Sequence, residues 1–139
     1  MDEEGTHLTA DEAKAIVRRR FEELDDGNFG ILDDLFSPKY KLNFPAREPL
    51  DLERTRQFYE EMYQAFRGLR HEIAEQVAEG NKVVTRWTAT GTHVGEFMGI
   101  EPTDEPVTFQ GINIYTFDGD KLVDSQVAWD LGSLGTPRP

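Results

Sequence analysis

In the first half of the chain, apolar residues recur at the three- and four-residue spacing of amphipathic helices. The first stripe covers residues 13–24, and it follows Thr9 and Glu12, whose spacing is that of a capping box at a helix start. A shorter stripe covers residues 29–36 and stops at a serine-proline pair. A third stripe covers residues 51–68, with an aspartate at its start and a glycine at its end. The pattern therefore predicts three helices.

In the second half, the spacing of apolar residues changes to the alternation that is typical of strands. This alternation predicts strands over residues 69–77, 83–93, 107–117 and 122–129, with a brief earlier strand over residues 40–44. On the first of them, one face carries Leu69, His71, Ile73, Glu75 and Val77. On the next, one face carries Val83, Thr85, Trp87, Ala89, Gly91 and His93.

Helices followed by a meander of strands predict an α+β fold, in which helices cover one face of a sheet. We expect a cone-shaped, curved antiparallel sheet, packed with three helices from the N-terminal half and enclosing a pocket. A chain of 139 residues is the size of one domain, so residues 1–139 are expected to form a single domain. Residues 1–8 are expected to be a flexible arm and residues 133–139 a flexible tail.

The amino-acid composition excludes several classes of function for this protein. The chain has no cysteine, which excludes disulfides, thiolate metal sites and cysteine nucleophiles. The start lacks the apolar core of a signal peptide, and no apolar run approaches the roughly 18 residues of a membrane helix. We therefore expect a cytoplasmic protein. The net charge of −12 repels nucleic acid and anionic membranes. The acidity fits either an ordinary solvated surface or adaptation to high salt.

Large apolar side chains predict what the pocket binds. The expected lining suits a small apolar or aromatic ligand, although some of these residues must belong to the core. It comprises Tyr40, Phe44, Phe58, Tyr59, Met62, Trp87, Phe97, Met98 and Trp129.

Asp130 is the first candidate catalytic residue, because it follows Trp129 at the end of the last apolar strand. Burial there would raise its pKa and let it act as a proton donor. The alternative is a turn-capping role, since Asp-x-Gly is also turn chemistry. His93 lies on the inward side of its strand and is the second candidate, with a purely structural histidine as the alternative. His71 is inward by the same argument and is assigned to the pocket lining.

No metal or organic cofactor is expected. His93 and Glu96 are three residues apart on an extended segment, which places their side chains on opposite faces. The sequence also lacks a glycine-rich phosphate loop, a nucleophile elbow and a basic stripe with interleaved aromatic residues.

Several segments together resemble one known family. The run 78–93, the segment 95–103, Gly111-Ile112 and the ending Trp129-Asp130-x-Gly132 resemble SnoaL-like polyketide cyclases. The resemblance implies the nuclear-transport-factor-2-like cone and an aspartate, here Asp130, as acid/base of an intramolecular aldol ring closure without a cofactor. It also implies supporting roles at Asn43 and at Thr116, which stands near the position of a family histidine. Gln126 and Ala128 also depart from the family pattern.

The leading hypothesis is a cofactor-independent acid/base enzyme of the cyclase type, acting on a hydrophobic carbonyl compound. The alternatives are a ketosteroid-isomerase-like or epoxide-hydrolase-like enzyme on the same cone, or a non-catalytic protein that binds a small molecule. A homodimer or higher homo-oligomer is also expected, because the strand 107–117 carries large apolar residues on both faces. These are Phe109, Ile112, Ile114, Tyr115 and Phe117.

Overall fold

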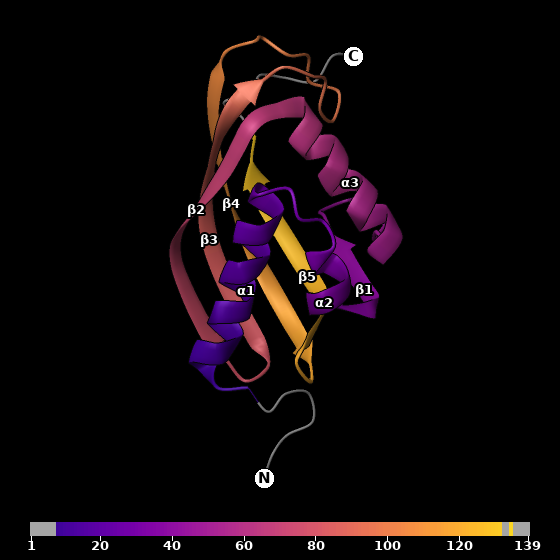
Figure 1. The fold of residues 1–139 in the computed structure, drawn as a ribbon, viewed down its shortest axis with the longest axis vertical. Helices are drawn as coiled ribbons and strands as arrows, with labels where there is room; N and C mark the ends of the chain where they lie inside the picture. The colour runs from indigo at the N-terminus through magenta and orange to yellow at the C-terminus, as the bar shows by residue number, and fades with distance from the viewer. Residues whose placement is uncertain (1–7, 132–133, 135–139) are drawn as a thin grey trace.

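The computed structural model describes residues 8–131 and Leu134, and it consists of one curved sheet with all three helices on the same face (Figure 1). This confirms the predicted α+β fold. The helices are α1 (Ala10–Asp25), α2 (Ile31–Leu35) and α3 (Leu52–Ala65). The strands are β1 (Phe36–Asn43), β2 (Phe66–Glu79), β3 (Lys82–His93), β4 (Pro106–Asp118) and β5 (Lys121–Asp130).

The sheet has the strand order β1-β5-β4-β3-β2. The four strands β2 to β5 form the predicted antiparallel meander, but β1 pairs with β5 in parallel. The sheet is therefore mixed and not wholly antiparallel. Strand β1 also begins at Phe36 and runs through Pro38, where the sequence pattern predicts a break. Proline is tolerated there because β1 is an edge strand, on which one side needs no ladder hydrogen bonds.

Side-chain caps mark the starts of α1 and α3. The hydroxyl of Thr9 accepts from the amide of Glu12 at 3.0 Å, and the Glu12 carboxylate accepts from the Thr9 amide at 2.9 Å, which confirms the capping box. The Asp51 carboxylate caps α3 by accepting from the Arg54 amide at 2.9 Å. The end of α3 differs from the prediction, because the helix stops at Ala65 and β2 begins at once. Gly68 lies inside β2, at a positive φ of 68° next to a register shift.

A second register shift in β2, between Ile73 and Glu75, changes which side chains face the helices. Such a bulge adds one residue to the strand and bends it. As a result Glu75 and Val77 lie outside, contrary to the predicted alternation. Glu75 pairs with Arg86 at 2.7 Å, and Val77 is 59% exposed.

The core lies between the concave face of the sheet and the helices, where α1 packs on β2 and β3 and α3 packs on β1 and β2. The predicted inward face of β3 is confirmed, with Val83, Thr85, Trp87, Ala89 and His93 all buried. On β4, Phe109, Tyr115 and Phe117 are buried. The other face of the sheet, here called the outer face, exposes Ile112 and Ile114.

The outer face leads to a prediction about assembly. Ile112 is 42% and Ile114 is 38% exposed on the central strand β4, and burying them against a second copy would remove both from water. We expect a homodimer through this face, and we expect Ile114→Lys to shift it toward monomer. Light scattering at micromolar concentration measures both. A wild-type monomer in both low and high salt would contradict the prediction.

Candidate functional site

A cavity lies between α1, α3 and the concave face of the sheet. Its empty space amounts to about 330 Å³, but it is narrow and holds little more than a water-sized molecule unless side chains move. Most of the wall is apolar, and a few polar groups converge on it, which is the usual composition of a small-molecule site. The lining residues are Arg20, Phe21, Leu42, Phe44, Phe58, Tyr59, Met62, His71, Trp87, Asn113, Val127 and Trp129.

Aromatic rings close one end of the cavity. Phe44 stacks on Trp129 with ring centroids 5.4 Å apart, and Phe58 contacts both of them. Phe97 packs against Phe58 and Trp129 from the other side. Phe44 and Phe58 also line a surface hollow that includes Arg47. Phe44 and Phe58 therefore lie between the cavity and this hollow, and a ligand that enters from the hollow must displace them.

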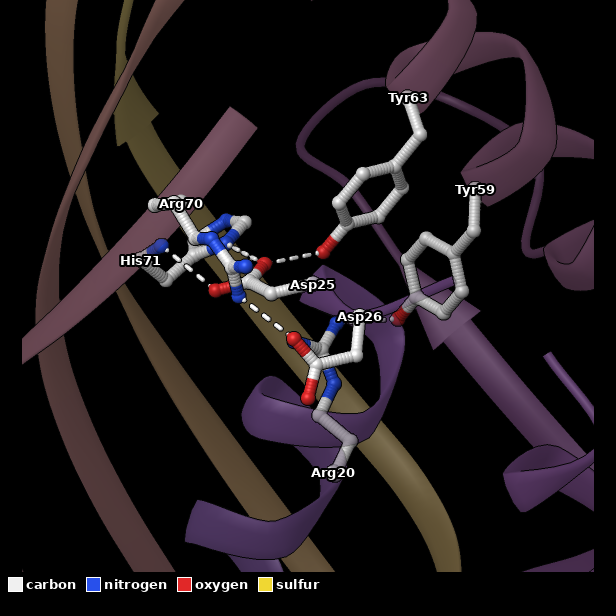
Figure 2. A network of polar contacts seen from close by, with 7 residues as sticks. All are labelled: Arg20, Asp25, Asp26, Tyr59, Tyr63, Arg70 and His71. Carbon is white, nitrogen blue, oxygen red and sulfur yellow. Dashed lines mark hydrogen bonds and ion pairs between the residues drawn. The ribbon is translucent and has the colours of Figure 1, made fainter. Parts of the chain in front are cut away.

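The strongest polar arrangement joins the end of α1 to β2. Figure 2 shows that Asp25 meets both His71 and Tyr63. One Asp25 oxygen lies 2.9 Å from Nδ1 of His71 and accepts from the Tyr63 hydroxyl at 2.6 Å. The other oxygen accepts from the His71 backbone amide at 2.7 Å. The side chains of His71 and Asp25 are only 3% and 4% exposed. Within the described residues, Nε2 of His71 makes no hydrogen bond, and His71 lines the cavity.

Burial and hydrogen bonds set the charges of this pair. Burial lowers the pKa of His71, even though the neighbouring Asp25 acts in the opposite direction. Burial would raise the pKa of Asp25, but the hydrogen bonds from His71 and Tyr63 hold it below its ordinary value. At neutral pH, Asp25 is therefore ionised and His71 is neutral. Since the carboxylate can only accept, Nδ1 carries the proton and Nε2 is a free base at the cavity wall.

These pKa directions predict how stability depends on pH. The folded pKa of His71 lies below its ordinary value of about 6.5, so its contribution is full above that pH and is lost as the pH falls. The folded pKa of Asp25 is also lowered, so its contribution is lost only below about pH 4. We expect the melting temperature to fall between pH 7 and 5 and again below pH 4. Calorimetry on His71→Asn, whose side-chain amide can still donate to Asp25, should show the first fall removed and the second retained.

Arg20 brings a positive charge into the cavity from α1. Its Nη2 donates to the Tyr59 hydroxyl at 2.7 Å, and the residue is 4% exposed. The guanidinium lies over the rings of Phe21, at 4.1 Å, and of Tyr59, at 4.9 Å. Trp87 and Asn113 line the same cavity, and Nε1 of Trp87 donates to Asn113 at 3.1 Å. Because Arg20 remains charged at any physiological pH, the cavity is electropositive at this point.

The structure brings five of the sequence-predicted binding residues to the cavity wall. These are Tyr59, Met62, His71, Trp87 and Trp129.

The remaining predicted binding residues lie elsewhere. Tyr40 is fully buried and donates to the Ser125 hydroxyl at 2.6 Å, so it belongs to the core. Asn43 donates to Asp124 and to the Ser125 carbonyl, which ties β1 to β5. Thr116 accepts from Nζ of Lys82 at 2.8 Å, away from the cavity. Phe97 belongs to the ring cluster at the cavity end, and Met98 lies in the turn beside it with a positive φ of 52°.

Asp130 does not reach the cavity. Successive side chains on a strand point to opposite faces, and Trp129 points inward, so Asp130 points outward. It is exposed, and it lines hollows of the outer face beside Gln110. Asp130 therefore lacks the buried position that the sequence pattern predicts. The structure also keeps it apart from the inward-facing His93.

His93 is fully buried and stacks on Phe66 with ring centroids 4.7 Å apart. Both ring nitrogens lack a hydrogen-bond partner in the described part of the chain, and His93 lines none of the described cavities. This is the geometry of a core residue. It favours the structural alternative over a catalytic role.

This placement predicts that His93→Leu leaves activity intact. Removing two buried nitrogens without partners offsets the lost stacking on Phe66, so we expect stability to change by no more than about 2 kcal/mol, in either direction. Urea unfolding and turnover of the same preparation test this. A folded variant with turnover reduced a hundredfold would restore His93 as a catalytic candidate.

Three polar residues of the site were not predicted from the sequence. Arg20 has a detectable signal, because it falls on the apolar stripe of α1 together with Val17 and Leu24. Asn113 has a weaker one, since it alternates with the inward-facing Tyr115 on β4. Asp25 has none, because its partner His71 is 46 residues away.

Neither a metal site nor a membrane span is found within residues 8–131. No group of three or more histidine, aspartate or glutamate side chains there could hold a metal ion. No helix among these residues is both long and apolar enough to cross a membrane.

Comparison with protein families decides the relationship. The profile of the SnoaL-like polyketide cyclase family matches residues 15–136, which is most of the chain. The chain belongs to this family. The match includes every element that lines the cavity, from α1 to β5. Among curated proteins, none matches the sequence.

Solved structures show the same fold. A proposed hydroxylase, AclR from Streptomyces galilaeus, superposes with a TM-score of 0.82 at 24% identity, over 91% of this chain and 80% of AclR. A proposed SnoaL-like polyketide cyclase from Jannaschia sp. CCS1 gives 0.81 at 20% identity, over 91% and 93% of the two chains. A proposed polyketide cyclase from Acidithiobacillus ferrooxidans gives 0.76 at 27% identity, over 87% and 90%. The likeness confirms the cone expected from the sequence.

Proposed function

We propose that this protein is a cofactor-independent acid/base catalyst that acts on a hydrophobic carbonyl compound, with His71 and Asp25 as its proton-transfer pair. One observation carries the proposal. A neutral imidazole stands at the wall of an apolar cavity, with Nδ1 held by a buried carboxylate and Nε2 left as a base. Membership of the cyclase family supports the reaction type.

The chemistry follows from the charge states of the pair. Nε2 of His71 removes a proton from the carbon next to a carbonyl, and the electron pair of the broken C–H bond moves onto the carbonyl oxygen as an enolate. The adjacent Asp25 carboxylate stabilises the imidazolium that forms and keeps the ring oriented. The enolate carbon then attacks a second carbonyl of the same molecule, and His71 returns the proton to the new alkoxide. Return of the proton to a different carbon of a conjugated enolate would instead give isomerisation.

The apolar wall supports this chemistry. Phe44, Phe58 and Trp129 exclude water from the base, which strengthens electrostatic interactions inside and protects an enolate from bulk acid. The assignment differs from the expectation that Asp130 is the acid, because Asp130 is exposed on the outer face.

Proton exchange tests the proposal without knowledge of the natural substrate. We expect the wild type to accelerate deuterium incorporation at the α-carbon of 2-tetralone in D₂O, measured by NMR, and Asp130→Asn to match it. We expect His71→Asn to fall to the buffer rate. A wild type that binds the ketone without accelerating exchange would contradict catalysis and favour a non-catalytic binding protein. Mass spectrometry of copurifying small molecules would then identify its ligand.

A further inference from the structure

Arg20 is a buried cation that forms no ion pair with a carboxylate of the described residues. The hydrogen bond to Tyr59 is the only one its guanidinium makes within the described residues, and Nε is fully buried without a partner. No carboxylate of these residues lies within 4 Å of the guanidinium; Asp25 pairs with His71, and Asp26 pairs with Arg70 at 2.8 Å (Figure 2). These two acids at the end of α1 therefore pair with other residues.

Such an arrangement is costly to keep for stability alone. A guanidinium stays charged when it is buried, and each N–H without a partner loses its hydrogen bonds to water. The rings of Phe21, Tyr59 and Tyr115 stabilise the charge from their faces, but a ring face does not replace a directional acceptor. A well-packed apolar side chain at this position would commonly be neutral or better for folding. The position of Arg20 on the cavity wall points to a ligand group that accepts its free donors.

The hydroxyl of Tyr59 provides a second hydrogen-bond donor next to Arg20. Tyr59 uses its oxygen to accept from Arg20, so its own hydrogen remains available to a ligand. Arg20 and Tyr59 both line the cavity, which His71 also lines. Charged donors of this kind bind a carboxylate or another anionic oxygen more strongly than a neutral carbonyl.

We propose that Arg20 and Tyr59 form a subsite for an anionic oxygen, so that the substrate is an apolar ring compound bearing a carboxylate or an ionised enol. The proposal rests on the proposed function only in taking this cavity as the substrate site. It adds that the substrate binds as an anion, and that Arg20 selects it against neutral analogues of the same shape.

Matched probes test the selection. Calorimetric titration would compare 2-naphthoate with the neutral 2-naphthamide, and the enolate of 2-phenyl-1,3-cyclohexanedione with the neutral 2-phenylcyclohexanone. We expect the wild type to bind at least one anion about 10- to 100-fold more tightly than its neutral partner, which is the range of a charge-assisted hydrogen bond. The anion with the larger preference over its neutral partner shows whether the subsite binds a carboxylate or an ionised enol. Equal affinity within both pairs, or no binding of either anion at millimolar concentration, would overturn the proposal.

Two variants assign the selectivity to Arg20. Arg20→Met is expected to bind the anion and its neutral partner equally, whereas Arg18→Met removes the same charge from an exposed position of α1 and should keep the preference. Without ligand, Arg20→Met should melt at the same temperature as the wild type or higher, since it removes an unbalanced buried charge. A melting temperature that falls by 10 °C or more in Arg20→Met, with anion preference intact in an uncharged Arg20→Gln variant, would show a structural arginine and overturn the subsite.

The test of the Arg20 subsite can be separated from the test of the proposed function. His71→Asn should keep the anion preference while it loses proton exchange. If His71→Asn loses proton exchange but the wild type shows no anion preference, only the Arg20 subsite is rejected. Anion preference without exchange in the wild type would reject catalysis and leave the subsite in place.

Discussion

Replacing His71 by asparagine is expected to lower turnover by about 10²- to 10⁴-fold, the usual contribution of a positioned general base. Asparagine can still donate to Asp25 from its side-chain amide, so the polar contact is kept while the titratable base is lost. Binding of an apolar fluorescent ligand should change little, because the apolar wall of the cavity is untouched. Turnover and ligand affinity measured on one preparation separate the two effects.

Asp25→Asn provides the matching variant within the pair. It removes the charge that stabilises the imidazolium and permits the wrong tautomer of His71, so turnover should fall by a similar factor. The double variant should lose little more than either single one, since the two residues act as a unit. Asp130→Asn serves as the control and should retain wild-type turnover. Full activity of His71→Asn together with loss in Asp130→Asn would reverse the assignment.

Local signals in the sequence predict the elements well. The capping box at Thr9 and Glu12 depends on neighbours three residues apart, and the alternation of β3 depends on a strand without bulges. The prediction fails where tertiary pairing decides. The parallel partner of β1 and the register shift after Ile73 depend on strands that are distant in sequence, and no local pattern encodes them.

The candidate site is less predictable for the same reason. Trp129 suggests a buried environment for Asp130 when the two are considered as sequence neighbours, but alternation along β5 turns them to opposite faces. Periodicity identifies His71 as inward, yet its chemistry comes from Asp25, which reaches it across the fold. Arg20 could be found from the helical stripe, since a charged residue on an apolar face calls for a partner.

Gly111 on β4 lies close to the indole ring of Trp87, and a substitution at this glycine is expected to have the second large effect on the protein. A Cβ added at Gly111 would lie 2.5 Å from a ring carbon of Trp87 and 3.0 Å from the Ala128 carbonyl oxygen and from Cβ of Trp129. Backbone and two large side chains bound this space, so none of them can yield freely. Only glycine leaves room for the Trp87 ring in the position from which it donates to Asn113 and lines the cavity.

Gly111→Ala is accordingly expected to destabilise the protein by about 1–3 kcal/mol, which lowers the melting temperature by roughly 4 to 12 °C for a chain of this size. Because the ring of Trp87 must move, its hydrogen bond to Asn113 should weaken, and near-ultraviolet dichroism and ligand affinity should both change. Gly30→Ala is the matched control, since the nearest atom to its added Cβ is Oδ1 of Asn28 at 3.4 Å, an ordinary contact. If both variants melt together with the wild type, the close contact at Gly111 does not position Trp87, and the polar wall of the cavity must be held by Asn113 and Tyr115 alone.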